Sequence, residues 1–348
     1  MRILVATTHV PFVFGGAEVH ANSLVEALRR AGHEAELVSI PFRWYPPEKI
    51  LDHLLACRLL DLTESNGVKV DRVIGLKFPA YHVPHPNKIL WVLHQYRTAF
   101  DLWNTPECDL AYYPEGREYR DTIAHLEIRL LHEAQRIFAN SQNVANRLRE
   151  FSKVDAPPLY HPPQDAEQFY SRDAEDFLFY PSRLCGLKRQ ELVIEALART
   201  RQPVVVHFAG KPDNPAFLEK LRRRAKQCNL GERVRFLGMI SNDDKRDLYA
   251  RCAGVVFPPQ DEDYGYITLE AMLASKPVVT CTDSGGPLEF VQHENSGLIA
   301  DPNPDSLAAG LDRLWKERAW AREAGVKGRR RIDELGINWP NVVSTLLQ

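Results

Sequence analysis

The sequence predicts an α/β protein built from two domains, each a parallel β-sheet with helices on both faces. Short apolar runs rich in β-branched residues alternate with segments of helical periodicity along the chain, which is the pattern of successive βαβ units. The length of 348 residues exceeds what one hydrophobic core usually supports. A proline-rich stretch at 155–165 interrupts the pattern near the middle. Because proline breaks helices and stiffens the chain, this stretch is predicted to link the domains.

In the first half, strands and helices alternate. The strands are short runs of Val, Ile, Leu and Phe, whereas the helices repeat apolar residues every three to four positions. The predicted strands are Ile3–Thr7, Ala35–Ile40, Arg72–Leu76, Ile89–Leu93 and Arg136–Ala139. The predicted helices are Ala17–Ala31, Glu48–Ser65, Arg117–Ala134 and Gln142–Phe151.

The second half repeats this scheme and ends in a further helical segment. The predicted strands are Phe177–Tyr180, Val204–Ala209, Val234–Leu237, Val255–Phe257 and Val278–Cys281. After Gly336 the chain returns to helical spacing over Trp339–Leu347. The predicted organisation is therefore a first domain at 1–155, a second domain at 156–331 and a terminal helix at 332–348.

Charge and cysteine content exclude several classes of protein. The 44 basic and 46 acidic side chains give a net charge of −2, which argues against nucleic-acid binding. Short basic clusters, Arg222–Arg224 and Arg329–Arg331, are typical of solvated helix faces, and weak attraction to an anionic membrane surface is the alternative. The 6 cysteines form no C-x-x-C pair, so neither a zinc site nor a disulfide framework is indicated. A reducing compartment is expected.

The N-terminal residues MRILVATTHV lead directly into a strand and do not resemble a signal peptide. No apolar stretch reaches the length needed to span a bilayer. We therefore expect a soluble, cytoplasmic protein. The basic clusters leave one alternative open, which is association with the inner face of the membrane.

The stretch from Asp261 to Pro287, DEDYGYITLEAMLASKPVVTCTDSGGP, is the most informative in the chain. Glu262 and Glu270 are separated by seven residues, with Gly265 between them and an apolar helical run around Glu270. A loop that carries Glu262 and leads into a helix that carries Glu270 accounts for this pattern. The free N–H groups and positive dipole end of such a helix would favour an anion such as phosphate.

The E-x7-E spacing, with YG inside it and followed by EAM, KPVV and SGGPLE, resembles the C-terminal signature of the family-four retaining glycosyltransferases (glycosyl transferases group 1). This resemblance implies the GT-B fold, with two Rossmann-like domains facing across a cleft and a C-terminal helix that crosses back to the first domain. It also implies that 1–155 is the acceptor side and 156–331 binds a nucleotide-sugar donor. Two residues depart from the common pattern. Tyr264 stands where Phe is usual, and Ser275 replaces a frequent glycine and is predicted to have an ordinary backbone conformation.

Two candidate sites lie in the first half. Gly15 and Gly16 open a helix after the first strand, where glycine allows close approach to an anion. A plain loop is the alternative, and a dinucleotide-binding loop is disfavoured because the G-x-G-x-x-G spacing is absent. His94 follows a strand at the edge where α/β sheets bind ligands, and a packing role is its alternative. The resemblance implies donor contacts for Gly15 and Gly16 and a position near the reacting side of the donor sugar for His94.

Arg183 and Lys188 follow the first strand of the second half, in FLFYPSRLCGLKRQ. Cations at that edge of a sheet suit a diphosphate, which needs positive charge both when bound and when leaving. Ordinary surface residues are the alternative. The resemblance implies that both bind the donor diphosphate, that Glu270 binds the ribose and that Glu262 lies near the transferred sugar. The remaining residues that it implies for donor binding are Gly210, Gly238, Met239, Ile240, Tyr264, Gly265, Tyr266, Ile267 and Thr268.

The resulting hypothesis is a retaining, metal-independent hexosyltransferase of polysaccharide biosynthesis. It would move a hexose from a UDP- or GDP-sugar to a hydroxyl of a glycan or lipid-linked acceptor, and it would need no cofactor. By resemblance, the leaving diphosphate takes the proton of the acceptor, so no enzyme nucleophile is required. Two alternatives remain at this point: an epimerase-type relative that cleaves the same bond, and a nucleotide-sugar-binding protein without turnover.

Overall fold

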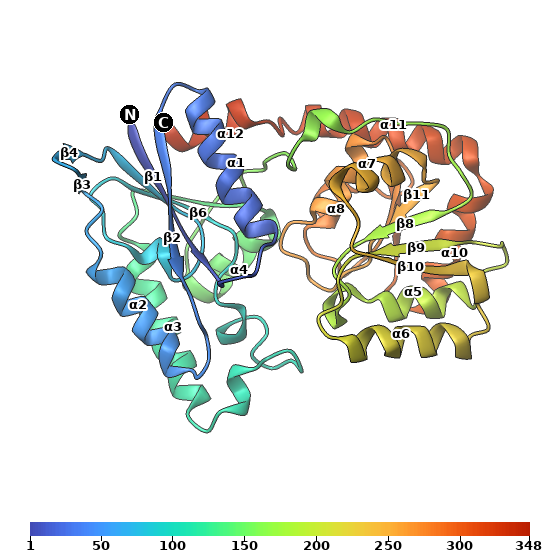
Figure 1. The fold of residues 1–348 in the computed structure, drawn as a ribbon, viewed down its shortest axis with the longest axis horizontal. Coiled ribbons are helices and arrows are strands. Elements are labelled where there is room, and N and C mark those ends of the chain that lie inside the picture. Colours follow the sequence, from blue (N-terminus) through green and yellow to red (C-terminus); the bar gives the residue numbers. More distant parts are fainter. The chain divides into compact units, whose positions relative to one another are not determined.

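The computed structural model describes residues 1–348, which form two compact units (Figure 1). The first unit is Met1–Gln164 together with Asn338–Gln348, and the second unit is Asp165–Ile337. The structure thus divides the chain at 164/165 and 337/338, whereas the sequence analysis divides it at 155/156 and 331/332. The proline-rich segment belongs to the end of the first unit.

The first unit contains a five-stranded parallel sheet in the order β2-β1-β5-β6-β7. The strand order changes direction between β1 and β5, as in flavodoxin-like sheets. These strands are β1 (Arg2–His9), β2 (Glu34–Pro41), β5 (Arg72–Gly75), β6 (Lys88–Val92) and β7 (Arg136–Ala139). A separate hairpin is formed by β3 (Glu64–Ser65) and β4 (Val68–Lys69).

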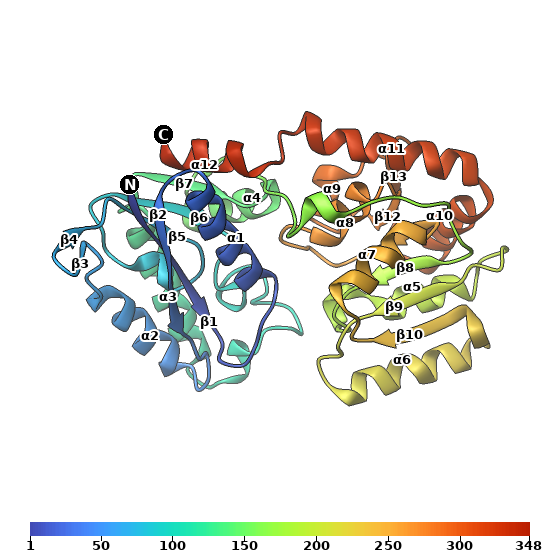
Figure 2. The ribbon, with the colours of Figure 1, turned by 45° about the horizontal axis from the view of Figure 1, so that its top comes forward.

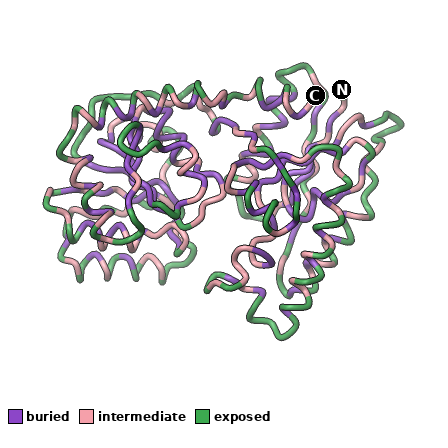
Figure 3. Tube along the Cα trace, turned by 180° about the vertical axis from the view of Figure 1, so that it is seen from behind, coloured by how far each residue is buried: buried purple, intermediate pink, exposed green.

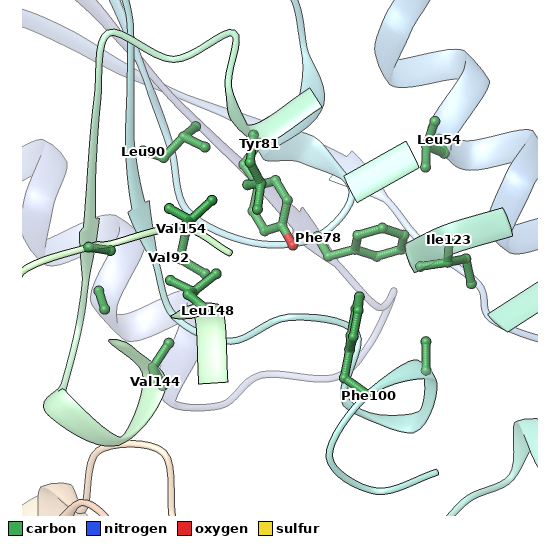
Figure 4. Packing of buried hydrophobic residues seen from close by; sticks show 14 of the residues in the cluster. Leu54, Phe78, Tyr81, Leu90, Val92, Phe100, Ile123, Val144, Leu148 and Val154 are labelled. Atoms are coloured by element: carbon green, nitrogen blue, oxygen red, sulfur yellow. The ribbon is translucent and has the colours of Figure 1, made fainter. Parts of the chain in front are cut away.

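Helices cover both faces of this sheet, because the consecutive apolar residues of β6 point alternately to its two faces. Ile89 and Trp91 of β6 join a core with α1 and α12, whereas Leu90 and Val92 join a second core with α2, α3 and α4. Figure 4 shows Leu90 and Val92 in the second core. The helices are α1 (Gly16–Arg30), α2 (Glu48–Leu59), α3 (Gly116–Leu131), α4 (Gln142–Ser152) and α12 (Trp339–Leu347).

The C-terminal helix α12 completes the first unit. Its residues Val342, Val343 and Leu346 are buried in the core that contains Trp91. Arg72 at the start of β5 donates from Nη1 to the carbonyl oxygen of Leu346 at 2.9 Å. The helices α1 and α12 therefore cover the same face of the sheet together.

The second unit contains a six-stranded parallel sheet in the order β10-β9-β8-β11-β12-β13. This is the Rossmann order, which changes direction between β8 and β11. The strands are β8 (Leu178–Pro181), β9 (Val206–Ala209), β10 (Val234–Gly238), β11 (Gly254–Val256), β12 (Val278–Cys281) and β13 (Gly297–Ala300).

Helices also cover both faces of the second sheet. Figures 1 and 2 show α5 and α6 on one face and α8 and α11 on the other. The helices are α5 (Gln190–Leu197), α6 (Pro215–Gln227), α7 (Asn242–Arg251), α8 (Tyr266–Leu273), α9 (Pro287–Phe290), α10 (Pro304–Lys316) and α11 (Arg318–Glu334). Short 3-10 turns are η1 (Ala80–His82), η2 (Arg97–Ala99), η3 (Leu110–Tyr112), η4 (Ala166–Gln168), η5 (Gly186–Lys188) and η6 (Gly231–Arg233).

Buried residues concentrate in the sheets of both units, and exposed residues lie on the outer helices and loops (Figure 3). Every residue of β6, β8 and β12 is buried. Continuous burial of this kind is typical of parallel strands that are covered on both faces.

Two local predictions are wrong, and one strand was missed. The helix predicted over Glu48–Ser65 ends at Leu59, because the following residues form the β3–β4 hairpin around Asn66 and Gly67, both with positive φ. The strand β13 was not predicted. Ser275 has a φ of 54°, so it adopts the left-handed conformation of the glycine that it replaces rather than an ordinary one.

Candidate active site

The candidate residues of the second unit gather where strands of its sheet end. Lys188 follows β8, Glu262 follows β11, and the turn Asp283–Gly286 follows β12. The strands β8 and β11 are neighbours, and the strand order changes direction between them. Open α/β sheets bind their ligands at this point, outside the carboxyl ends of the strands.

Lys188 and Glu262 form an ion pair at this edge of the sheet. The ammonium group of Lys188 donates to Oε2 of Glu262, and the two side chains are 17% and 23% exposed. Lys188 Nζ also lies 5.4 Å from the centroid of the Phe257 ring. The pair is accessible to a ligand, and an incoming phosphate would compete with Glu262 for the ammonium group.

The loop that carries Glu262 is fixed through its backbone to the turn after β12. Glu262 N–H donates to the Ser284 carbonyl oxygen at 3.0 Å, and Gly286 N–H donates to the Glu262 carbonyl oxygen at 2.8 Å. A Cβ atom on Gly286 would lie 2.5 Å from the carbonyl oxygen of Tyr264. Only glycine permits this approach, so the SGGP segment has a structural role.

Glu270 lies on α8 and is held by two residues of α7. Lys245 Nζ donates to Oε1 at 2.7 Å, and the Tyr249 hydroxyl donates to Oε2 at 2.8 Å. Burial, together with the Glu270 charge, raises the pKa of Tyr249, so its hydroxyl remains a donor. The sequence analysis did not identify Lys245 or Tyr249, although their i, i+4 spacing on one helix predicts a shared face.

The start of α8 is built as a tight turn. Gly265 has a φ of 90° and precedes the helix, and the Thr268 N–H donates to its carbonyl oxygen at 2.9 Å. That amide is therefore used within the first turn, which leaves fewer of the predicted amide donors for a ligand. The side chains of Tyr264 and Thr268 are 3% and 0% exposed, and Tyr264 packs against Phe290. Tyr266 and Ile267 form the first turn of α8 and are partly exposed.

The other predicted donor residues lie after β8, β9 and β10. Arg183 is 65% exposed and pairs with Asp213, Nε to Oδ1, at 3.2 Å. Gly210 has a φ of 148°, and a Cβ there would lie 2.1 Å from the Ser182 carbonyl oxygen. Its N–H donates to the carbonyl oxygen of Gly238 at 2.8 Å.

Two predicted apolar residues follow Gly238. Met239 is 73% exposed, and Ile240 is partly exposed. Both side chains are thus available for apolar contact with a ligand.

In the first unit, Gly15 and Gly16 lie at the start of α1. Gly15 N–H donates to Oε2 of Glu18 at 2.9 Å, and Glu18 Oε1 lies 4.0 Å from Lys77 Nζ. Gly15 has an extended backbone, with a φ of −155°, that any residue can adopt. An internal carboxylate thus occupies part of the predicted anion position, and Lys77 partly offsets its charge.

His94 lies on the loop after β6 and is half-buried, with Nδ1 donating to the Gln95 carbonyl oxygen at 2.7 Å. The next residue, Gln95, is fixed by a buried polar network. Its amide nitrogen lies 2.7 Å from both Glu127 Oε1 and Ser152 Oγ. Glu127 is fully buried. No sequence motif pointed to Gln95 or Glu127, because their partners come from distant helices.

Across the chain, no group of three or more His, Cys, Asp or Glu side chains is arranged to hold a metal ion. None of the helices has the length and apolar character needed to cross a bilayer.

The chain thus consists of two Rossmann-like units, and the second unit has a cation–carboxylate pair at the point where its strand order changes. These features define a class of α/β protein that binds ligands at the carboxyl ends of its strands. The chain matches the family model "Glycosyl transferases group 1" over residues 163–334 and "Glycosyltransferase Family 4" over residues 14–161. It belongs to the family-4 glycosyltransferases of group 1.

Several characterised and uncharacterised proteins are similar in sequence. The human alpha-1,3/1,6-mannosyltransferase ALG2 is 28% identical over 245 residues, which cover 63% of this chain and 59% of that protein. An uncharacterized glycosyltransferase of Methanocaldococcus jannaschii is 25% identical over 98% of this chain and 96% of its own. The O-antigen chain mannosyltransferase C of Escherichia coli is 24% identical over 96% and 94% of the two chains.

Solved structures confirm the predicted fold class. Sucrose-phosphate synthase from Thermosynechococcus elongatus superimposes with a TM-score of 0.80 at 20% identity, over 99% of this chain and 98% of that one. HepE of Anabaena, solved in complex with UDP-glucose, gives a TM-score of 0.71 at 17% identity over 100% and 98% of the chains. At these identities the similarity establishes the fold alone.

Proposed function

We propose that this protein is a retaining glycosyltransferase that moves a hexose from a UDP- or GDP-sugar to a hydroxyl of a glycan or lipid-linked acceptor. The observation that carries the proposal is the accessible Lys188–Glu262 pair at the carboxyl ends of β8 and β11. Two relatives named as mannosyltransferases and a structural relative solved with UDP-glucose support the donor class. The relative named for O-antigen chains supports a role in polysaccharide biosynthesis.

Lys188 is proposed to bind the donor diphosphate. Its ammonium group would leave Glu262 for the phosphate oxygens and stabilise the negative charge that develops on the leaving diphosphate. Arg183, whose side chain is 65% exposed, adds a second positive charge that can reach a ligand. These two cations supply charge that a bound metal supplies in other enzymes, so we propose metal-independent transfer without a cofactor.

The reaction is proposed to proceed on one face of the sugar. The bond between the anomeric carbon and the diphosphate oxygen breaks, and a bond from the acceptor oxygen forms on the same face. The diphosphate oxygen that leaves accepts the proton of the acceptor hydroxyl. In this proposal no enzyme nucleophile takes part.

The two glutamates have different proposed roles. Glu262, once Lys188 engages phosphate, can accept hydrogen bonds from hydroxyl groups of the transferred sugar. Glu270 is proposed to bind the ribose hydroxyls. A carboxylate has about four lone-pair sites, and the bonds from Lys245 and Tyr249 use two of them. His94 is proposed to contact the donor sugar or the acceptor from the first unit.

The first experiment measures thermal unfolding of the purified protein with UDP, GDP and ADP and with UDP-glucose and GDP-mannose, without metal. A ligand that binds only the folded state raises the midpoint, so a shift with one nucleotide family identifies the donor base. Turnover with the matching sugar donor and an acceptor, with the anomeric configuration read by NMR, tests retention.

The alternatives give different results in the same experiment. An epimerase-type enzyme would convert the donor in the absence of any acceptor. A non-catalytic protein would show the midpoint shift without turnover. No shift with any nucleotide would overturn the proposal.

A further inference from the structure

Arg189 directly follows Lys188 and connects η5 to α5. Its φ of 54° and ψ of 39° lie in the left-handed region, which glycine adopts freely and which a residue with a Cβ atom adopts at a cost. The backbone alone would therefore favour glycine at this position. An arginine here brings a guanidinium group to the turn that carries Lys188.

The Arg189 guanidinium forms a two-pronged ion pair with Asp283, in the turn after β12. Nη1 donates to Oδ1 at 2.7 Å, and Nη2 donates to Oδ2 at 2.6 Å. The Arg189 side chain is only 18% exposed. Two parallel hydrogen bonds of this kind fix orientation as well as distance, so the pair sets how the Lys188 turn lies against the Asp283 turn.

The turn at Asp283 also forms backbone hydrogen bonds to the loop that carries Glu262. Asp261 N–H donates to the Asp283 carbonyl oxygen at 2.9 Å, and Glu262 N–H donates to the Ser284 carbonyl oxygen at 3.0 Å. Arg189 is thereby connected, through Asp283 and the backbone, to the residue that pairs with its own neighbour Lys188.

The Lys188 turn is thus linked by one ion pair to the Glu262 loop and by a second to the Asp283 turn, which holds that loop through its backbone. The Lys188–Glu262 pair must open for Lys188 to engage a phosphate, whereas the Arg189–Asp283 pair has no such conflict. A backbone bond from Gln260 N–H to the Leu187 carbonyl oxygen, at 2.8 Å, also joins the loops. It restrains the chain before Lys188, and the Tyr180 hydroxyl donates to the Lys188 carbonyl oxygen. Arg189 adds the side-chain link from this turn to Asp283.

We propose that Arg189 and Asp283 form a positioning pair that keeps Lys188 and Glu262 in register while a donor diphosphate replaces the bond between them. The pair acts through Lys188 and contacts no substrate. This inference rests on the proposed function, because it gives Lys188 a phosphate to bind.

The test compares R189G, R189K and D283N with the wild type and with R199A. R189G removes the guanidinium without a backbone conflict, since glycine adopts the left-handed conformation. R189K keeps the charge but cannot form the two parallel bonds. Arg199 forms an exposed surface pair with Asp305 in the same unit, so R199A is the matched control. Turnover of the sugar donor selected above and the melting temperature are measured for each.

We expect R189G and D283N to lower kcat/KM for the donor about tenfold, with melting temperatures close to that of R199A. R189K should recover part of the loss. In a K188A background, R189G should cause little further loss, because the pair acts through Lys188. A merely structural role would give the same fractional loss with or without Lys188.

Three outcomes would overturn the inference: unchanged turnover in R189G, equal losses in the Lys188 and K188A backgrounds, or recovery of activity in R189K to the wild-type value. Failure of the proposed function is separate, because it would appear in the wild type as the absence of nucleotide-sugar binding and turnover. That result would remove the basis of the positioning role as well.

Discussion

The Tyr249 hydroxyl and the Glu270 carboxylate are joined by a 2.8 Å hydrogen bond that links α7 to α8. Lys245, one turn earlier on α7, donates to the other oxygen of the same carboxylate. The orientation of Glu270 is therefore set by α7 before any ligand binds. Removing one of these donors should disturb ligand binding more than folding.

The substitution Y249F should raise the donor KM about fivefold while changing kcat little. Loss of one hydrogen bond to a charged group is worth about 1.5–3 kcal/mol, and the bond that Lys245 keeps to Glu270 lowers that figure. The matched control is Y170F, because Tyr170 donates to Asp247 in a similar bond at the surface, at 3.2 Å. Steady-state kinetics with varied donor checks the prediction. Equal KM values for Y249F and Y170F would contradict it.

The substitution K188A should lower kcat by a factor of about 10² to 10³, since one charge that stabilises a leaving group has this effect. Circular dichroism and the melting temperature should stay close to those of the wild type, because Lys188 is partly exposed. K220A is the control, since Lys220 forms a surface pair with Glu191 at 2.7 Å. Full activity in K188A would show that the diphosphate is bound elsewhere.

Acid should destabilise the first unit through His20 and His161, whose ring nitrogens lie 2.8 Å apart in its core. Burial lowers the pKa of His161 to about 3 and lowers that of His20 well below its usual value. The folded state therefore binds fewer protons than the unfolded state below about pH 6.5. This contribution to stability is fully present well above pH 6.5 and is lost as pH decreases, by about 2 kcal/mol from His161 alone between pH 7.5 and 5.

Urea unfolding at pH 7.5 and pH 5 measures this dependence. The variant H161Q should lose less stability than the wild type over that interval, because glutamine does not titrate. H125Q, which changes an exposed histidine, should keep the wild-type dependence. Parallel pH profiles for the wild type and H161Q would rule out the assignment.

The substitution L346A should destabilise the first unit by about 2–5 kcal/mol, because Leu346 is fully buried and its truncation leaves a cavity. L347A, at a partly exposed neighbour, should cost clearly less. If the two units unfold separately, only the transition of the first unit should shift. Tryptophan fluorescence reports that transition in a W315F/W320F background, since Trp315 and Trp320 belong to the second unit whereas Trp91 and Trp339 lie in the core of the first.

The sequence predicted most elements of the fold because both sheets are parallel and buried on both faces. The predicted helix at Trp339–Leu347 has the bounds of α12. The β3–β4 hairpin was missed although Asn66-Gly67 is a hairpin signal, because the apolar residues before it continued the helical spacing of α2. The prediction for Ser275 failed because the Lys276 N–H donates to the Ala271 carbonyl oxygen at the end of α8, and this helix-ending bond requires a left-handed residue at Ser275.

The candidate site was predictable only as a set of residues. Motif spacing pointed to Lys188, Glu262 and Glu270, and the structure brings the first two together. The partners of these residues carry no motif: Asp283 lies almost a hundred positions after Arg189, and the two meet only because β8, β11 and β12 are adjacent in the sheet. Contacts of this kind depend on strand order, which a single sequence does not display.

The return of α12 to the first unit affects how the protein is made. A ribosome that has translated Gln164 has supplied all five strands of the first sheet, yet Val342, Val343 and Leu346 are still missing from the core around Trp91. The second unit, Asp165–Ile337, leaves the ribosome as an uninterrupted segment before those residues do. Since domains fold as units during synthesis, the half of the protein that is translated first is the half that is completed last.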